Sequence, residues 1–297
     1  MSFLKRSGSK TKPFWEGEPL VEEKEIFSTL AERKGSSLFL GRYSLNEVQA
    51  VLGKKGLFKE AHRRNLWPLD FELDSREYPL QRLQIFYRDK SPENLIVDLR
   101  VREGEYPLKV RLEGLAAVIT PKSLILEWLT LQNPLASFTE KKAPLPGQMH
   151  PGLSLSKKIM DIFVYLARLN HMDCLLAFPA YCHNALLFSR YFHFMNPEKE
   201  GEVIAIRKAF SHMPFKQLAW IVHLNCLRRA DGSVYEWRSE EQVYPLNRTL
   251  REYLESRSYK ERVKAAQRGL EFTVDWEGFR ARAKDVPALC GSRENVL

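Results

Sequence analysis

The segment from Ser123 to Met195 constrains the fold of this chain more than any other part of it. It opens with a mostly apolar run of β-favouring residues, Ser123–Gln132, which predicts a strand. A loop rich in Pro and Gly, Pro146–Ser156, follows, and apolar residues then recur from Ser156 to Leu169 at the spacing of an amphipathic helix. A strand, a loop and a helix in this order indicate the start of an α/β unit.

Two further elements complete the unit. Cys174–Phe178 is a second short apolar run and predicts another strand, and about Asn184–Met195 has the pattern of a second amphipathic helix. Strands joined by a crossover helix pair in parallel, because a tight turn between them would make them antiparallel. We therefore expect Ser123–Gln132 and Cys174–Phe178 to be neighbouring parallel strands of a mixed sheet.

Elsewhere the chain alternates between strand and helix patterns. Ser44 and Glu47 have the spacing of a capping box, which predicts the start of a helix. The Asp231–Gly232 dipeptide predicts a hairpin turn between strands at Leu218–Leu227 and Val234–Tyr244. The other predicted strands are Ser37–Gly41, Leu69–Leu73, Leu80–Tyr87, Leu95–Arg102 and Leu108–Leu112, and the other predicted helices are Glu22–Arg33, Leu57–Asn65, Glu198–Phe210, Asn247–Glu255 and Tyr259–Gly269.

Length and composition predict one large α/β domain with an appendage. The chain has 297 residues, and its 44% hydrophobic content is enough for a sizeable core. We expect a disordered basic tail at residues 1–21, the main domain at 22–246 and a helical C-terminal extension at 247–297. The N-terminal sequence has no apolar signal region, no apolar run is long enough to span a bilayer, and the four cysteines form no CxxC pair. These features predict a cytoplasmic protein with reduced thiols.

The net charge of +9 leaves the nature of the partners open. Such a charge suits an anionic partner, such as nucleic acid, a membrane surface or a phosphorylated ligand, but a basic protein also exists without one. The lysines and arginines occur as scattered pairs rather than as one basic block. This distribution argues against nucleic acid as the partner.

The loop before the helix at 156–169 is the most informative motif. Gly147 and Gly152 permit close backbone approach or a positive φ, and Ser154 and Ser156 are candidate caps of the helix. Two lysines follow in the first helical turn, where positive charge is unfavourable unless an anion binds there. One interpretation is an anion site at the helix N-terminus. The alternative is a structural loop followed by solvated lysines.

The order of elements resembles the GNAT superfamily of N-acyltransferases. In that family a Q/R-x-x-G-x-G/A loop after the fourth strand holds the pyrophosphate of acyl-CoA through backbone amides. The sequence QMHPGLS at residues 148–154 is similar to this loop with one residue inserted. The resemblance implies a GNAT-like mixed sheet flanked by helices, with the two central parallel strands splayed apart at the loop. It assigns binding of acetyl-CoA or another acyl-CoA, as substrate, to Gln148, His150, Gly152, Leu153, Ser154, Leu155 and Ser156.

A second GNAT-like signature, similar to NxxAxxLYxxxGF, aligns with CHNALLFSRYFHF at residues 182–194. The tyrosine that often serves as general acid in the family falls on Ser189, and the glycine falls on His193. Tyr191 is the nearest phenol to this position and is the candidate acid. The run LPGQMHPGL also resembles one in bacterial proteins that carry LPGQxHPGLG, which implies no activity.

Glu127 is the candidate general base. It lies in the middle of the strand that leads into the loop, and burial among apolar neighbours would raise its pKa and suit it to accept a proton from an amine. The alternative is a glutamate that faces solvent. The histidines predict no metal site, because none is in an HExxH context and the spacing of His183 and His193 does not put both on one helix face.

Two functions follow from these patterns. The first is an acyl-CoA-dependent N-acyltransferase that acts on an amine not identified by the sequence. The second is a non-catalytic binding or scaffold protein on a GNAT-like fold, which the serine at position 189 favours. Direct binding of nucleic acid through the basic surface is a third and weaker interpretation.

Overall fold

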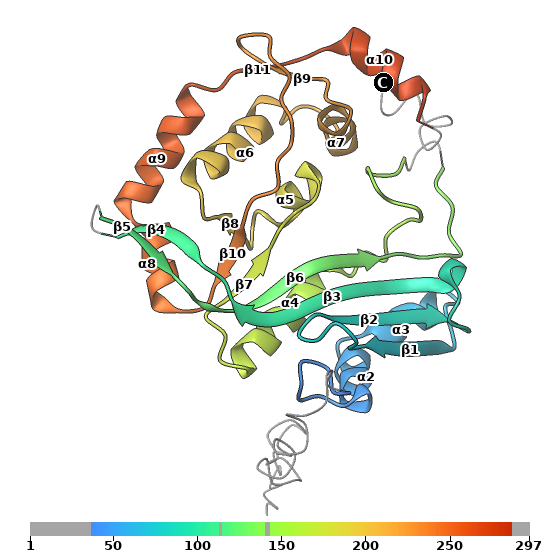
Figure 1. The fold of residues 1–297 in the computed structure, drawn as a ribbon. Helices are drawn as coiled ribbons and strands as arrows, with labels where there is room; N and C mark the ends of the chain where they lie inside the picture. The colour runs from blue at the N-terminus through green and yellow to red at the C-terminus, as the bar shows by residue number, and fades with distance from the viewer. Residues whose placement is uncertain (1–36, 113–114, 140–142, 287–297) are drawn as a thin grey trace, which may run out of the picture.

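The computed structural model describes residues 37–112, 115–139 and 143–286, and a seven-stranded mixed sheet lies at its centre (Figure 1). The strand order is β1-β2-β3-β6-β7-β10-β8. The bounds of these strands, in that order, are Leu69–Asp74, Gln81–Tyr87, Leu95–Glu105, Lys122–Leu131, Cys174–Ala177, Gln242–Pro245 and His193–Phe194. The sheet is therefore built from both halves of the chain, and β10 enters it between β7 and β8.

β6 and β7 are parallel, as the sequence predicts. Their register runs from Ser123 opposite Cys174 to Leu126 opposite Ala177, and helix α4, Ser156–Leu169, connects them. β7 then ends, while β6 continues to Leu131. In Figure 1 β7 runs upward and away from β6, so the two strands diverge. The other pairs of this sheet are antiparallel.

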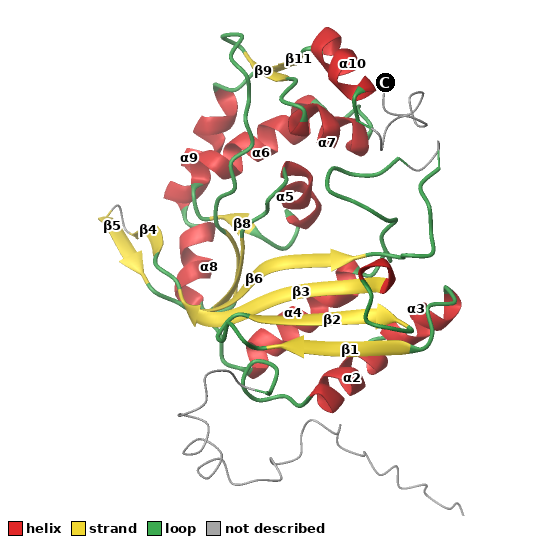
Figure 2. Cartoon of the chain, turned by 45° about the vertical axis from the view of Figure 1, so that its right-hand side comes forward, coloured by secondary structure: helices red, strands yellow, loops and turns green. Residues whose placement is uncertain are grey.

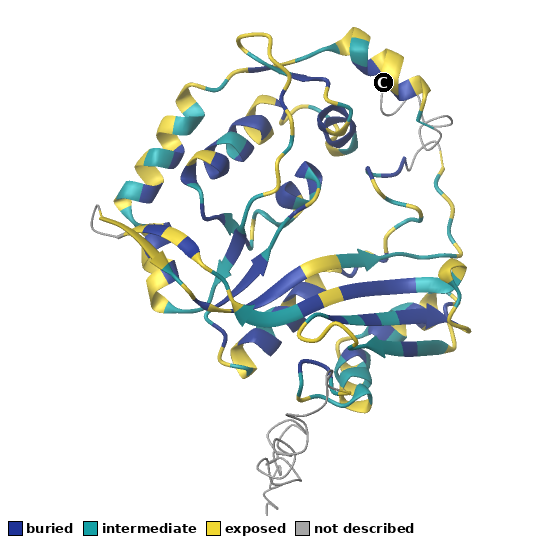
Figure 3. Cartoon of the chain, viewed as in Figure 1, coloured by how far each residue is buried: buried dark blue, intermediate teal, exposed yellow. Residues whose placement is uncertain are grey.

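Three helices cover one face of the sheet (Figure 2). α2, Leu45–Lys54, begins with the predicted capping box of Ser44 and Glu47, and α3, Leu57–Arg63, follows it. α4 buries an apolar stripe that includes Ile159, Phe163 and Leu166 against β1, β2, β3 and β6. Figure 3 shows buried residues along the strands of the sheet and on the inward sides of the helices that pack on it. The apolar residues of α4 recur on one side of the helix, and this side packs against the sheet.

The opposite face carries a hairpin and two helices. The hairpin consists of β4, Leu108–Leu112, and β5, Leu115–Ile119, and the helices are α8, Arg248–Glu255, and α9, Arg257–Arg268. These elements form a second apolar cluster with inward residues of β6, β7 and β10. Two tyrosine hydroxyls join the helices to the edge of the sheet: Tyr253 donates to the Met195 carbonyl at 2.9 Å and Tyr259 to the Phe194 carbonyl at 2.6 Å.

A further group of helices, which we call the upper lobe, lies above the end of the sheet that holds β8 (Figure 2). It is built around a third apolar cluster. Its helices are α5, Cys182–Phe188, α6, Pro197–Ala209, α7, Phe215–His223, and α10, Trp276–Lys284, and its strands are β9, Leu227–Arg229, and β11, Phe272–Val274. β9 and β11 pair antiparallel, which joins the insertion between β8 and β10 to the C-terminal extension.

Four predicted elements differ from the structure. Val234–Tyr244 is not a continuous strand: Val234 forms only an isolated bridge to Arg228, and β10 begins at Gln242. Leu218–Leu227 is not the first strand of a hairpin, because α7 occupies Phe215–His223. Its residues from Gln217 to Val222 are all buried, and a short helix that is apolar on every side has the sequence pattern of a buried strand. Ser37–Gly41 forms only an isolated bridge between Phe39 and Tyr43.

The helix predicted at 184–195 is also too long, because α5 ends at Phe188 and β8 follows. The helix predicted at 22–33, the tail at 1–21 and the end of the chain at 287–297 lie outside the described residues. The elements that the sequence did not predict include the 3-10 turn Pro92–Asn94 and the short strands β5 and β11. Within the described ranges, no helix combines the length and the apolar composition needed to cross a bilayer.

Candidate functional site

The opening between β6 and β7 is the feature around which candidate functional groups gather. Beyond the pair Leu126–Ala177, no described strand pairs with β6 on the side of β7 until Gln132 bridges to Gly152. This stretch of strand edge therefore offers backbone donors and acceptors to an extended ligand. We call the point at which the two strands separate, after the pair Leu126–Ala177, the apex.

A β-bulge lies at the apex. On β3, Arg100 faces Trp128 and Val101 faces Leu126, so Glu127 is an extra residue on β6 without a partner in the ladder. A bulge bends its strand and redirects side chains, and such bulges are frequent beside active sites. Glu127 lies on the same face as Ile125, two residues before it, which is the face on which β4, β5 and α8 pack, and there it meets Arg102, the neighbour of Ile125 across the strands.

Five residues form what we call the apex group: Arg102, Tyr106, Glu127, Phe178 and Glu241. Arg102 Nε donates to Glu127 Oε1 at 2.7 Å. The Tyr106 hydroxyl donates to Glu241 Oε1 at 3.1 Å, and the Tyr106 ring lies edge-on to Phe178 at 5.4 Å between centroids. Phe178 directly follows β7 and Glu241 directly precedes β10. Tyr106 thus contacts residues at the ends of β7 and β10, and the charges of Arg102 and Glu127 act on its hydroxyl.

The environments of the two ionisable candidates differ. Burial raises the pKa of Tyr106 above its usual value, and its hydrogen bond to Glu241 raises it further. This phenol is therefore protonated at neutral pH and is able to donate a proton. The sequence predicts that Glu127 is buried among apolar neighbours, and this is wrong. Its side chain is 32% exposed and forms an ion pair with Arg102. The interaction is made by Oε1, and no described residue bonds to Oε2.

Tyr191, the acid predicted from the sequence, does not lie near Glu127. It follows α5 in a turn that its amide closes by donating to the Phe188 carbonyl at 2.8 Å. Its ring is partly buried against the apolar cluster under α4, and the Arg190 guanidinium stacks on it at 4.7 Å. Glu127 points to the other face of the sheet. The structure thus does not bring the two predicted catalytic residues together.

The loop that follows β6 is held by its own polar side chains. The side-chain Oε1 of Gln148 accepts a hydrogen bond from the backbone amide of Leu145 at 2.9 Å. The backbone amide of Gln148 donates to the Leu145 carbonyl. Gly147 has a φ of +77°, and a Cβ built there would lie 2.6 Å from the Tyr181 hydroxyl, so only glycine fits. His150 is half-buried in the same loop. Gln148 and Gly147 therefore shape the loop.

The loop then enters α4. Gly152 bridges to Gln132, the side chains of Leu153 and Leu155 are buried, and Ser154 has a left-handed backbone with a φ of +59°. The sequence predicts that Ser154 and Ser156 cap the helix, and this is wrong. Leu155 occupies the N-cap position, and no side-chain hydrogen bond caps the helix there. The buried leucines fix the loop in place and leave the helix entry uncapped.

The first amides of α4 are consequently free. No described residue accepts a hydrogen bond from the amides of Ser156, Lys157 or Lys158, and the first helical bond is donated by Ile159 to the Leu155 carbonyl at 3.0 Å. All three residues are exposed. Unpaired amides at a helix start carry partial positive charge and are suited to bind an anion.

Basic side chains surround this helix entry. Arg64 Nη2 donates to the Leu153 carbonyl at 2.8 Å and so fixes the turn before α4. The buried Nε of Arg64 makes no hydrogen bond to a described residue, although it lies 3.5 Å from the Glu60 carboxylate. The Lys158 ammonium lies beside Gly56, at the start of α3. The positive charge of these side chains suits an anionic ligand. The sequence does not reveal that α3 and Arg64, which follows it, lie beside the start of α4.

The histidines take structural positions. His183 is buried, its ring stacks on Tyr181, and burial lowers its pKa to about 4. His193 Nδ1 lies 3.2 Å from the Glu200 carboxylate, and this hydrogen bond raises the pKa of His193. Within the described part of the chain, no group of three or more His, Cys, Asp or Glu residues could hold a metal ion.

Arg102, Tyr106 and Glu241 were not predicted as site residues, because each lies far along the chain from the residue that it contacts. The only usable signal was the position of Tyr106 just after a predicted strand. Comparisons of the chain with protein-family models, with curated proteins and with solved structures found no match.

Proposed function

We propose that the protein is an N-acyltransferase that uses acetyl-CoA or another acyl-CoA and acts on an amine. The observation that carries this proposal is the arrangement of β6, the loop and α4: two parallel strands separate where an uncapped, basic helix entry begins. The strand order, with β10 inserted between β7 and β8, supports the resemblance to the GNAT superfamily, since that family places its terminal hairpin at the same edge.

In this proposal the pyrophosphate of acyl-CoA binds at the start of α4. The amides of Ser156, Lys157 and Lys158 donate to its oxygens, and the two lysine side chains add charge. The pantetheine arm then lies in extended form along the unpaired edge of β6, from Leu131 toward the apex. Such an arm carries amide groups, and the strand edge offers it matching donors and acceptors.

The apex group supplies the chemistry. The amine nitrogen attacks the thioester carbonyl, so that a C–N bond forms and the C–S bond breaks. Glu127 Oε2 takes the proton that the amine loses, and the Tyr106 hydroxyl gives a proton to the departing CoA thiolate. Backbone donors at the bulge polarise the carbonyl oxygen. The products are an amide and free CoA.

The second candidate is a binding protein that retains the acyl-CoA site without turnover. The observation that favours it is Ser189, which stands at the position of the family's usual acid and uses its hydroxyl to donate to the Leu186 carbonyl at 2.9 Å. The two functions differ in one measurement. Calorimetric titration detects acyl-CoA binding in both, whereas release of CoA in the presence of an amine occurs only in the first.

Reversing the charge at the helix entry is expected to weaken acyl-CoA binding. In the double variant Lys157→Glu/Lys158→Glu, two carboxylates face the anion site, and we expect the Kd for acetyl-CoA to rise at least about tenfold, or about 1.4 kcal/mol. The matched control is Lys260→Glu/Lys264→Glu on the exposed face of α9, which should bind as the wild type does. Equal affinity in both double variants would place the anion elsewhere.

A further inference from the structure

The upper lobe contains a pocket of about 580 Å³ that takes no part in the proposed acyl transfer. It lies between α6, α9 and the extended segment that leads from β9 to β10. The volume is within the range of small-molecule sites, roughly 300–1,000 Å³. None of the apex group and none of the loop residues at 148–156 lines it.

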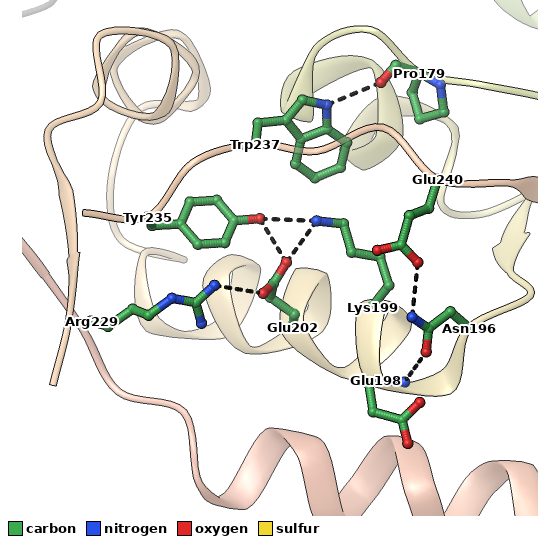
Figure 4. A network of polar contacts seen from close by, with 9 residues as sticks. All are labelled: Pro179, Asn196, Glu198, Lys199, Glu202, Arg229, Tyr235, Trp237 and Glu240. Atoms are coloured by element: carbon green, nitrogen blue, oxygen red, sulfur yellow. Dashed lines mark hydrogen bonds and ion pairs between the residues drawn. The ribbon is translucent and has the colours of Figure 1, made fainter. Parts of the chain in front are cut away.

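A buried charge network forms the inner wall of the pocket (Figure 4). Lys199 is only 6% exposed; its Nζ donates to Glu202 Oε1 at 2.7 Å and lies 4.3 Å from the centroid of the Trp237 ring. The fully buried Tyr235 donates to the same Glu202 oxygen at 2.8 Å, and Arg229 Nη2 donates to Oε2 at 3.1 Å. Two cations therefore share a single carboxylate, and this wall carries excess positive charge.

The outer wall is an extended segment whose successive side chains point alternately toward the pocket and away from it. Val234, Glu236, Arg238 and Glu240 line the pocket, whereas the intervening Tyr235 packs into the core, as expected for a period of two. Neither the Glu236 nor the Arg238 side chain forms an ion pair or hydrogen bond with a described residue. Glu240 Oε2 accepts only a neutral donor, the amide of Asn196, at 2.8 Å.

The pocket thus presents charged groups of both signs that have no charged partner among the described residues and are open to solvent. Arg229 bonds to Glu202 through one nitrogen, and Arg238 keeps its whole guanidinium, so both can donate to an anionic group. Neither Glu236 nor Glu240 forms an ion pair with a cation in the part of the chain that the structure describes. Glu198 also lines the pocket, but its carboxylate forms an ion pair with Arg262 at 2.8 Å. It therefore does not require a cation from a ligand.

We propose that this pocket binds a small zwitterion, an α-amino acid with an apolar side chain. Its carboxylate is held by Arg229 and Arg238, and its ammonium group by Glu236 and Glu240. A ligand with a single charge would leave one set of these groups desolvated and unpaired, which costs free energy. Val234, Ala266 and Leu270 provide the apolar part of the lining for the side chain.

The test uses the full chain and three probes that share the leucine side chain and differ in charge. L-leucine carries both charges, L-leucinamide only the positive one, and N-acetyl-L-leucine only the negative one. By isothermal titration calorimetry without acyl-CoA, we expect L-leucine to bind at least about tenfold more tightly than either analogue. The absence of acyl-CoA makes the result independent of the proposed transferase function.

Variants locate the site. Arg238→Gln and Glu236→Gln each remove one exposed charge from the pocket, so neither should affect folding, and each should weaken L-leucine binding at least about tenfold. Arg257→Gln, a change on the exposed face of α9, is the matched control and should not alter it. The proposal is wrong if no standard amino acid binds, if either single-charge analogue binds as tightly as L-leucine, or if the pocket variants bind L-leucine as the control does.

Discussion

Glu202→Gln is expected to lower the free energy of unfolding by about 3 kcal/mol. The change removes the carboxylate that Lys199 and Arg229 share, and Lys199 is only 6% exposed, so water can compensate little for the lost charge. A buried ammonium without a counter-ion is among the most destabilising defects in a protein core. Urea or thermal denaturation of the variant against the wild type measures the effect.

Two further variants make this result specific. Glu252→Gln removes a carboxylate that pairs with Arg248 on the exposed face of α8, and we expect it to change stability by less than about 1 kcal/mol. Lys199→Met/Glu202→Gln removes both buried charges and should recover part of the loss, since Arg229 is 35% exposed and can be solvated. A loss for Glu202→Gln as small as that of Glu252→Gln would show that the network does not stabilise the upper lobe.

The pH dependence of this network has a definite sign. Burial by itself raises the pKa of Glu202, but Lys199, Tyr235 and Arg229 outweigh burial, so the pKa lies below its ordinary value of 4.5. A carboxyl with a lowered pKa stabilises the native state fully above its ordinary pKa. That contribution is lost as the pH falls through the lowered value, and Glu202→Gln should no longer show this part of the acid sensitivity.

Glu127→Gln is expected to reduce turnover of acyl-CoA with an amine acceptor by about 100-fold, or about 2.7 kcal/mol. The amide cannot take the proton of the amine, but it keeps the shape of the side chain, so the Kd for acyl-CoA should not change. Release of the CoA thiol, followed with a thiol reagent, measures the rate. Tyr106→Phe removes the proposed acid and should have a smaller effect, because a thiolate can also leave with water as the proton donor.

Glu105→Gln is the matched control, since Glu105 is exposed at the end of β3 and lies outside the apex group. If Glu127→Gln and Tyr106→Phe both keep the rate of this control, the apex group does not perform the chemistry. If acyl-CoA binds but no amine is ever acylated, the protein is the binding protein of the second proposal.

The α/β unit at the centre of the fold was predictable because its signals are local. The apolar period of 156–169 fixes α4, and a crossover helix requires β6 and β7 to run in parallel. α7 was not predictable in the same way, because burial on all sides removes the amphipathic pattern by which a helix is distinguished from a strand.

The candidate sites depend on contacts between distant residues. Tyr106 meets Glu241, 135 positions away along the chain, and no spacing rule connects them. Lys199 lies in a charged helical segment and has the sequence context of a solvated lysine; only the packing of Tyr235 and Trp237 over it explains its burial. Conversely, the segment at 146–156 was recognisable as a loop, since its proline and glycine residues are local signals, and the φ of +77° at Gly147 requires glycine there.

Hydrogen–deuterium exchange of the full chain, with and without acetyl-CoA, locates the binding site most directly. We expect acetyl-CoA to slow exchange in two segments, the helix entry around Ser156–Lys158 and the unpaired edge of β6 at Glu127–Leu131, because the ligand would occupy their free amides. α9 should exchange equally in both states. Absence of any change in those two segments, or protection confined to the upper lobe, would contradict the proposed acyl-CoA site.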